Sequence, residues 1–457
     1  MDNWVNKSNT ELIALLQEQA QTIALLLQNI QALEQEIARL KGQKSEASKP
    51  KPELPTWFKP SKPDPPAKIK KQRKDAFVRP RETPTQEIVY ACSHCPDCGR
   101  TLAGGSEYSR RQVIELPEIK VQITDHVLVS RYCGVCQKSC RPEVDLSEET
   151  VGRSRFGQQI HAFIAYLRQV GRLPIRTISL LLSGFCHLKI SDGEVVGMLS
   201  SVATLGKTTY DSLQAILRAS PFVHGDETGW RENGQNGYLW SFSTPSVCYF
   251  TYPKSRSGQI VMEVLGEKYK GVVVSDFYGG YNSHLGFHQR CWVHLLRDVH
   301  ELTRKFPTDG VMNWAKQLRE LYDRAKACGC PLFQSDDPHE REDRAFGFQS
   351  ELVSLVRGYK GTGLPQSVLC ERLLRFANQM FSFVWCVGCP SENNAAERSI
   401  RPRVIARKIS GGTRSEAGSA TMAILSSLFT TWQLQGKEGL SACRQMLVEA
   451  QRKPVVA

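Results

Sequence analysis

Residues 271–276 read GVVVSD, a short apolar run that ends in an aspartate, and the stretch FYGG follows at 277–280. Such a run is typical of a buried strand. A carboxylate at the end of this strand lies at the carboxyl edge of a sheet, where the sites of α/β proteins form. Residues 222–226, FVHGD, repeat the pattern. Two strand-end acids, Asp226 and Asp276, can therefore converge on one site.

The segments around these two runs also favour an α/β fold. Residues 238–242 and 247–252 carry strand patterns on either side of a Thr-Pro-Ser turn. Residues 257–265 suit a helix, and residues 307–370 are poor in strand pattern and are predicted to be helical. We therefore predict an α/β domain over residues 216–457 with a helical insertion at about 307–370.

A third acid lies in the stretch SENNAAERSIRP at residues 391–402. This stretch is predicted to form a helix of about ten residues that ends near Pro402, because proline restricts the residue before it. The helical period places four polar side chains on one face. They are Asn393, Asn394, Glu397 and Arg401. A carboxylate flanked by amides and a guanidinium is unusual for core packing and suits a site for metal and phosphate.

Three carboxylates, from Asp226, Asp276 and Glu397, suit two Mg²⁺ ions, which prefer oxygen ligands. Such a pair of ions can activate water or a 3′-hydroxyl and stabilise the leaving oxygen in phosphoryl transfer. Taken singly, each acid is compatible with an ordinary position at a strand end or on a helix surface. Basic residues close to the third acid favour phosphoryl transfer. The predicted phosphate contacts are Arg398, Arg401, Arg407 and Lys408.

Four stretches resemble the transposases of the insertion-sequence 66 family, within the DDE superfamily. They are HGDETGWR at 224–231, DFYGGY at 276–281, CWVHLLRD at 291–298 and NNAAERSIRP at 393–402. The resemblance spans nearly the whole chain. It implies an RNase H-like catalytic domain and Mg²⁺-dependent DNA cleavage and strand transfer at the terminal inverted repeats of an insertion sequence. It also implies that Asp226, Asp276 and Glu397 are the metal-binding triad.

Residues 9–41 contain no glycine or proline and keep a seven-residue apolar repeat. One series of positions is Leu16, Ile23, Ile30 and Ile37, and the other is Leu12, Gln19, Leu26, Leu33 and Leu40. This spacing predicts a leucine-zipper-like coiled coil over residues 1–43, and hence a homodimer or a higher oligomer. A single amphipathic helix packed on its own domain is the alternative.

Residues 44–88 are rich in proline and in basic side chains, so they are predicted to form an extended linker. The basic cluster at 68–74 can follow a phosphate backbone. A solvated spacer is equally compatible with this composition.

Two Cys-x2-Cys pairs mark residues 89–150 as a small zinc-binding, β-rich domain. The predicted ligands are Cys95, Cys98, Cys133 and Cys136, with strands expected at 112–117 and 120–130. The spacing between the pairs is longer than usual, so other nearby side chains are credible substitute ligands. These are Cys92, His94 and Cys140.

Residues 151–215 are predicted to be a helical DNA-binding segment. Residues 172–199 read as helix, turn and helix, with Ser191 capping the second helix and Glu194 three residues later. This pattern is compatible with a DNA-binding helix-turn-helix, and also with an ordinary helical hairpin. Four further cysteines, at 328, 330, 386 and 389, could form a second metal site, but buried free thiols are the favoured interpretation.

The whole-chain composition agrees with a DNA partner. Of 457 residues, 59 are Lys or Arg and 46 are Asp or Glu, which gives a net charge of +13. Such an excess favours a polyanion. The chain has no apolar run of about 18 residues and no signal-peptide pattern, which predicts a cytoplasmic, nucleoid-associated bacterial protein without a membrane partner. The fifteen cysteines are an odd number, which fits free thiols and metal ligands better than disulfides.

Two other functions are compatible with these patterns. One is an RNase H-like structure-selective DNA nuclease, which would cleave DNA without joining it. The other is a non-catalytic, zinc-containing DNA-binding regulator, which would bind the ends without chemistry. Accessory transposition proteins are a further possible class of partner.

Overall fold

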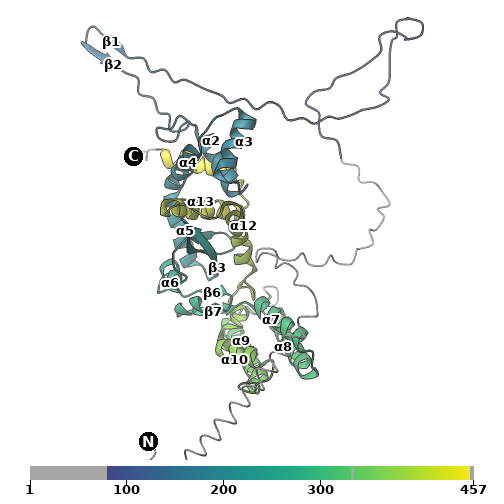
Figure 1. The fold of residues 1–457 in the computed structure, drawn as a ribbon, viewed down its shortest axis with the longest axis vertical. Helices are drawn as coiled ribbons and strands as arrows, with labels where there is room; N and C mark the ends of the chain where they lie inside the picture. Colours follow the sequence, from purple (N-terminus) through teal and green to yellow (C-terminus); the bar gives the residue numbers. More distant parts are fainter. Residues whose placement is uncertain (1–79, 331–333, 453–457) are drawn as a thin grey trace, which may run out of the picture. The chain divides into compact units, whose positions relative to one another are not determined.

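The computed structural model describes residues 80–330 and 334–452 (Figure 1). The coiled coil predicted for residues 1–43 and most of the linker predicted for 44–88 lie outside the described residues. The chain divides into two compact units, residues 1–114 and 115–457, and the second contains the predicted catalytic region. No helix of the described residues is long and apolar enough to cross a membrane.

A five-stranded mixed sheet forms the centre of the second unit, which confirms the α/β prediction. Its strand order is β5-β4-β3-β6-β7. Strands β3, β4 and β5 pair antiparallel, whereas β6 pairs parallel with β3 and β7 pairs parallel with β6. The strands are β3 (Phe222–Glu232), β4 (Gln235–Ser243), β5 (Cys248–Thr251), β6 (Val272–Ser275) and β7 (Phe287–Arg290).

Helices cover both faces of this sheet because its strands are apolar on both sides. On one face, Trp240 and Val273 pack with α5 (Lys207–Ala219) and α6 (Gln259–Leu265). On the other face, Leu239 and Phe250 pack with the helix that carries Glu397. That helix is α12 (Asn394–Ser410).

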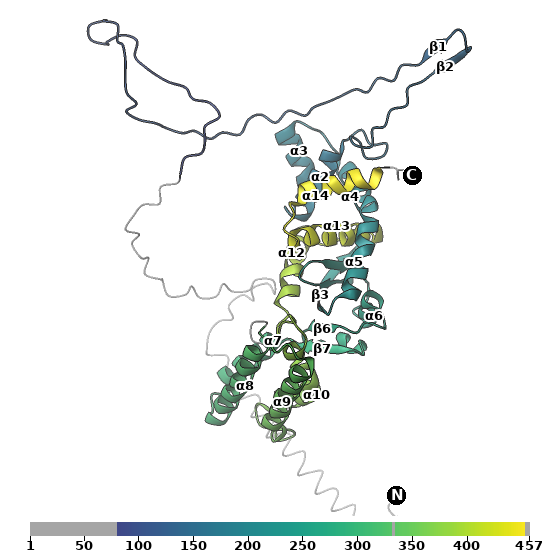
Figure 2. The same ribbon diagram turned by 180° about the vertical axis from the view of Figure 1, so that it is seen from behind.

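Helix α13 (Glu416–Leu434) lies against the edge strand β5 and joins the sheet to a helical bundle (Figure 2). Its Ser427 and Thr431 hydroxyls accept hydrogen bonds from backbone N–H groups of β5, at 2.8 and 3.0 Å. The other members of the bundle share one apolar core with α13. They are α2 (Gln158–Gln169), α3 (Ile175–Cys186), α4 (Asp192–Leu205) and α14 (Gly439–Gln451).

Helices α3 and α4 occupy the region predicted to be helix, turn and helix. The predicted cap of the second helix is confirmed, because Ser191 and Glu194 form a reciprocal capping box at the start of α4. The Ser191 hydroxyl accepts a hydrogen bond from the Glu194 N–H at 3.2 Å, and the Glu194 carboxylate accepts one from the Ser191 N–H at 2.9 Å.

Residues 292–330 and 334–385 form a helical region with its own core, in which Trp292, Trp314 and Phe381 are buried. Tyr322 stacks on Trp292 inside this core, with ring centroids 4.8 Å apart, and the Ser382 hydroxyl donates a hydrogen bond to the His288 carbonyl of β7 at 2.6 Å, which ties the region to the sheet. Its helices are α7 (Trp292–Lys305), α8 (Asp309–Cys328), α9 (Pro338–Arg357), α10 (Ser367–Phe376) and α11 (Ser382–Trp385).

The prediction of strands at 112–117 and 120–130 is wrong. Both segments lack strand pairing, and their apolar side chains, including Ile114 and Ile123, are exposed. Strands are stable only when a partner pairs with them and their apolar face is covered. Of the β-rich structure predicted for 89–150, the structure has one two-stranded hairpin, β1 (Arg131–Cys133) and β2 (Lys138–Cys140).

Candidate catalytic site

Strands β3 and β6 bring the first two predicted acids to the same edge of the sheet. The parallel register pairs His224 with Val274. Asp226 and Asp276 each follow two residues later, so they lie side by side where β6 ends. A backbone N–H holds one oxygen of each carboxylate, from Glu227 to Asp226 at 2.9 Å and from Tyr278 to Asp276 at 2.8 Å.

The residue before α12 fixes the third acid next to this edge. Asn393 is 1% exposed, and its side-chain amide donates a hydrogen bond to the Gly225 carbonyl at 2.7 Å. Its Oδ1 lies 2.9 Å from Nδ1 of His224. Glu397 is in the first turn of α12, so it projects from a helix start that is tied to β3 directly beside Asp226.

The predicted end of this helix near Pro402 is wrong, because α12 continues to Ser410 with Pro402 inside it. A proline inside a helix removes one helical hydrogen bond, and its ring crowds the carbonyl four residues earlier. Beyond it, Arg403 and Ala406 are buried, and this packing outweighs the local preference to stop. Asn393, predicted to lie on the helix face, instead occupies the N-cap position.

The carboxylates influence one another electrostatically. Burial, together with the charges of Glu227, Asp276 and Glu397, raises the pKa of Asp226 to about 7, even though a backbone hydrogen bond from Glu227 lowers it. Like charges that share a poorly solvated site disfavour ionisation. A bound cation would favour the charged form of the Asp226 carboxylate, because the positive charge offsets the repulsion from the neighbouring acids.

The surroundings of the three acids fit a divalent cation. Asp226, Asp276 and Glu397 are all oxygen donors, which hard cations prefer. Oε1 of Glu397 is buried without a hydrogen-bond partner. Among residues 80–330 and 334–452, no group of three His, Cys, Asp or Glu side chains is gathered closely enough to hold a metal.

Helix α7 places a histidine against the third acid. Nε2 of His294 lies 3.4 Å from Oε1 of Glu397. The start of α7 is held in place because the Cys291 N–H donates to the Ser275 carbonyl at 2.8 Å and the Trp292 N–H donates to the Ser391 carbonyl at 3.0 Å. The motif CWVH at 291–294 contains this histidine, but the motif alone does not predict its contact with Glu397.

A second group missing from the sequence prediction lies beside Asp226. The Glu227 side chain is 3% exposed and accepts hydrogen bonds from the Tyr281 hydroxyl at 2.7 Å and from Arg256 at 2.6 Å. The Arg256 guanidinium also lies 3.8 Å from the ring centre of Tyr278. The adjacent acids at 226 and 227 were a visible signal for Glu227, whereas no sequence pattern pointed to Arg256.

The four predicted phosphate contacts differ in their environments. Arg398, Arg401 and Lys408 are exposed on α12. Arg407 is partly buried and donates hydrogen bonds from Nη1 to the Gly229 carbonyl and to the Thr228 hydroxyl. Arg407 thus also links α12 to β3.

Each predicted zinc-binding cysteine pair forms its own turn. In the first unit, the Gly99 N–H donates to the Cys95 carbonyl at 2.9 Å, and in the second unit the Cys136 N–H donates to Cys133 Sγ at 3.4 Å. Backbone hydrogen bonds lower the pKa of the Cys95 and Cys133 thiols. Lower thiol pKa values favour the thiolate form that binds metal.

The remaining cysteine cluster is part of the sheet packing. Cys386 and Cys389 are buried against Phe222, Val272 and Val274. All fifteen cysteines are free thiols.

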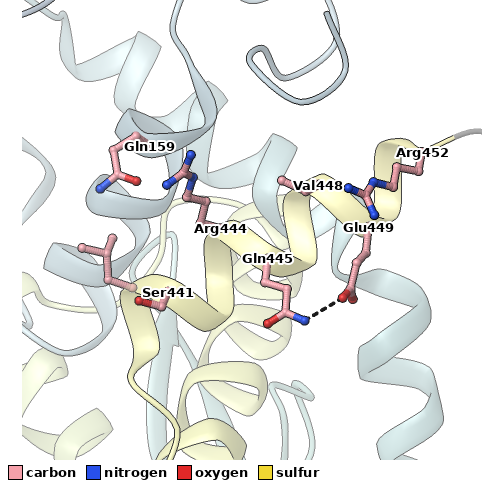
Figure 3. Close-up of a pocket in the computed structure, with 8 residues that line it drawn as sticks. Gln159, Ser441, Arg444, Gln445, Val448, Glu449 and Arg452 are labelled. Carbon is pink, nitrogen blue, oxygen red and sulfur yellow. Dashed lines mark hydrogen bonds between the residues drawn. The ribbon is translucent and has the colours of Figure 1, made fainter. Parts of the chain in front are cut away.

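A separate cavity of about 480 Å³ lies along α14 and contains none of the three acids. Figure 3 shows Gln159 of α2 facing Arg444 and other polar side chains of α14. Gln445 donates a hydrogen bond to Glu449 at 2.8 Å along the same helix (Figure 3).

A comparison with protein families matches the chain to a model described as Transposase IS66 family, over residues 153–421. The matched region runs from just before α2 into α13 and includes all three acids. A comparison with curated proteins finds no match.

Proposed function

The chain belongs to the IS66 family of transposases, enzymes that act on DNA, and from this premise we propose that it cleaves and transfers DNA strands at the terminal inverted repeats of an insertion sequence. The observation that carries the proposal is the pairing of His224 with Val274, which sets Asp226 beside Asp276 at the sheet edge that α12 approaches with Glu397. A mixed sheet with acids at this edge supports an RNase H-like catalytic domain.

Asp226, Asp276 and Glu397 would hold Mg²⁺ in this proposal. When bound, two such ions supply activation of the attacking oxygen and stabilisation of the leaving oxygen. The protein's own part is to hold the carboxylates in place. Backbone N–H groups fix Asp226 and Asp276, and Asn393 fixes the start of the helix that carries Glu397.

The reaction has two displacements at phosphorus. Water attacks the phosphodiester at the transposon end, the bond to the 3′-oxygen breaks, and that oxygen takes up a proton to become a 3′-hydroxyl. The 3′-hydroxyl then attacks a phosphodiester of the target DNA, where a new ester bond forms as an old one breaks. Both steps require in-line placement of the attacking oxygen, which rigidly held acids favour.

Phosphate groups near the acids would be held by exposed cations of α12. The side chains of Arg398, Arg401 and Lys408 make no hydrogen bond with another described residue, so their N–H groups are available to bind DNA. We propose the same role for Arg407, whose second terminal nitrogen makes no hydrogen bond within the part of the chain that the structure describes. Each phosphate contact contributes mainly electrostatically, so binding should weaken with added salt.

The N-terminal regions would recognise the DNA ends and assemble the complex. We propose that α3 and α4 act as a DNA-binding helix-turn-helix, and that Cys95, Cys98, Cys133 and Cys136 hold a structural Zn²⁺. The thiol donor set and the lowered pKa values of Cys95 and Cys133 fit such an ion. Residues 9–41 would pair two or more copies, and the protein would act on DNA in the bacterial cytoplasm.

The test uses labelled duplexes that carry the terminal inverted repeats flanking the gene. Asp226→Asn, Asp276→Asn and Glu397→Gln should each abolish cleavage and joining in Mg²⁺ while end binding persists. Glu416→Gln, an exposed acid in the first turn of α13, is the matched control and should retain both activities. Cleavage without joining in the wild type would instead indicate a nuclease. Unchanged chemistry in the three variants would refute the proposed site.

A further inference from the structure

Arg256 is a cation held at the edge of the sheet where the acids lie. It follows β5 in the segment that leads to α6, and its side chain is 45% exposed. Two neighbours hold it in place. Its Nη2 donates to Glu227 at 2.6 Å, and its guanidinium lies 3.8 Å from the ring centre of Tyr278.

Both neighbours belong to the segments that carry the catalytic acids. Glu227 directly follows Asp226, and the Tyr278 N–H donates to the Asp276 carboxylate at 2.8 Å. The Tyr278 hydroxyl also donates to the Arg256 carbonyl at 2.8 Å, which fixes the backbone of the loop. The guanidinium is therefore positioned by the same residues that position Asp226 and Asp276.

Most of the hydrogen-bonding capacity of Arg256 is unused. Its Nε and Nη1 make no hydrogen bond within residues 80–330 and 334–452. A guanidinium has five donors arranged to match the oxygens of a phosphate. Stacking on an aromatic face leaves the edge of the planar group free to make these bonds. The exposed edge thus carries unpaired donors close to Glu227, the residue that follows Asp226 in β3.

We propose that Arg256 binds a non-bridging phosphate oxygen of the DNA strand that Asp226, Asp276 and Glu397 act on. This inference rests on the proposed function. Glu227 and Tyr278 act as positioning residues, because they hold the guanidinium in place without contacting the phosphate. Glu227 is nearly fully buried and already receives two hydrogen bonds, so it keeps Arg256 in place and is not a further metal ligand.

The placement has a chemical consequence. Charge accumulates on the non-bridging oxygens as the phosphorus is attacked, and a fixed cation stabilises that charge more than it stabilises the ground state. Arg256 should therefore affect the rate of cleavage more than it affects end binding. Replacement of a residue that only maintained the fold would lower stability, and it would not slow cleavage more than it weakens end binding.

The experiment compares Arg256→Gln with Lys254→Gln, a matched loss of one charge at an exposed position of the same loop. Single-turnover cleavage of labelled end duplexes in Mg²⁺ gives the rate, and binding in Ca²⁺ over a series of salt concentrations gives the affinity and its salt dependence. Arg256→Gln should slow cleavage by about a hundredfold. It should also reduce the slope of log affinity against log salt by about one. Lys254→Gln should change the rate less than about threefold, because Lys254 is exposed and makes no side-chain hydrogen bond or ion pair with another described residue.

Arg256→Lys separates the charge from the geometry of the guanidinium. Lysine keeps the charge but loses the fork of donors, so cleavage should fall by about tenfold. This variant also decides the matter if Arg256→Gln fails to fold, which circular dichroism would reveal. Equal cleavage rates for wild type and the Arg256 variants would overturn the inference and leave the proposed function intact. A wild type that neither cleaves nor joins in Mg²⁺ would overturn the proposed function itself.

Discussion

The side chain of Asn393 bridges the strand that carries Asp226 and the helix that carries Glu397. Its amide donates to the Gly225 carbonyl at 2.7 Å, and its Oδ1 lies 2.9 Å from the His224 ring. The Asn393 N–H also donates to Cys291 Sγ at 3.2 Å. One buried side chain therefore sets the spacing between two acids that are far apart in the sequence.

Replacement of Asn393 should disturb catalysis more than it disturbs folding. Asn393→Ala removes both side-chain hydrogen bonds and leaves the Gly225 carbonyl without this donor, which should cost about 1–3 kcal/mol of unfolding free energy. A displacement of Glu397 by about 1 Å should slow cleavage by about a hundredfold. Urea unfolding and single-turnover cleavage of end duplexes measure the two effects.

Asn313→Ala is the control for this prediction, because Asn313 is an exposed asparagine of α8 and makes no side-chain hydrogen bond within the described part of the chain. It should alter stability by less than about 0.5 kcal/mol. If both variants cleave DNA at the same rate, Asn393 does not set the position of Glu397.

The raised pKa of Asp226 predicts how the metal-free protein responds to pH. Its pKa is about 7 in the folded chain, against an ordinary value of 3.8. Between these values the folded state holds more protons than the unfolded state, so the stability contributed by this group is full below about pH 4 and is lost as pH rises towards 7. Asp226→Asn removes this dependence and should be more stable than wild type at pH 8 by roughly 2–4 kcal/mol.

Urea unfolding of wild type and Asp226→Asn in EDTA, from pH 4 to pH 8, measures this difference. The gap between the two should close as pH falls towards 4. Added Mg²⁺ at pH 8 should stabilise the wild type and leave Asp226→Asn unchanged, since ligand binding to the folded state raises stability. Parallel pH profiles for the two proteins would show that Asp226 ionises normally.

The sequence predicted the parts of the site that depend on local pattern. Asp226 and Asp276 were recognisable because each follows an apolar run, but the strand expected to end at Asp226 continues to Glu232, since β4 pairs with it over this length. The cap at Ser191 followed from two residues three positions apart. The ion pair of Arg256 with Glu227 was not predictable in this way. It joins residues 29 positions apart through the fold, and Arg256 lies in a loop without periodicity.

Long-range packing also explains two other wrong local predictions. Pro402 normally favours a helix end, but buried Arg403 and Ala406 hold the following turns of α12 in place. The apolar residues at 112–117 fit a strand, but a strand needs a partner, and the neighbouring sequence provides none within the described residues. Pairing and burial are properties of the whole fold, so a local pattern cannot determine them.

A buried contact between α2 and α12 predicts a strong energetic coupling. Arg403 is 4% exposed, and its Nη2 donates to the Gln169 carbonyl at 2.8 Å while its Nη1 donates to Gln169 Oε1. No carboxylate forms an ion pair with Arg403 in the part of the chain that the structure describes. Gln169→Leu would leave a buried guanidinium without its main side-chain acceptor and should cost about 2–4 kcal/mol.

The double variant Gln169→Leu with Arg403→Met should be less destabilised than the sum of the single variants, by at least about 1 kcal/mol, because the unpaired charge is gone. Urea unfolding followed by circular dichroism provides the four free energies. Gln159→Leu, at an exposed position of the same helix, controls for loss of an amide. Additive effects would mean that the two side chains do not depend on each other.

The proposed zinc site predicts a metal content that depends on particular cysteines. The purified chain should contain one Zn²⁺, and Cys95→Ser or Cys133→Ser should each lower the content at least tenfold, because serine does not replace a thiolate ligand. The backbone hydrogen bonds that lower the pKa of both thiols favour the metal-binding form at neutral pH. Atomic absorption on the full chain measures the content.

Cys92→Ser and Cys140→Ser distinguish the proposed ligands from their substitutes. Both thiols are exposed, as those of Cys98 and Cys136 are, so exposure alone does not separate the two sets. If the four proposed cysteines are the ligands, these two variants should retain full zinc content. If Cys140→Ser loses zinc and Cys136→Ser retains it, the fourth ligand is Cys140 of β2 and not Cys136. A wild-type chain that binds no zinc when it folds in the presence of Zn²⁺ would contradict the proposed site. Four thiolates in a formed site bind this ion far more tightly than the buffer does.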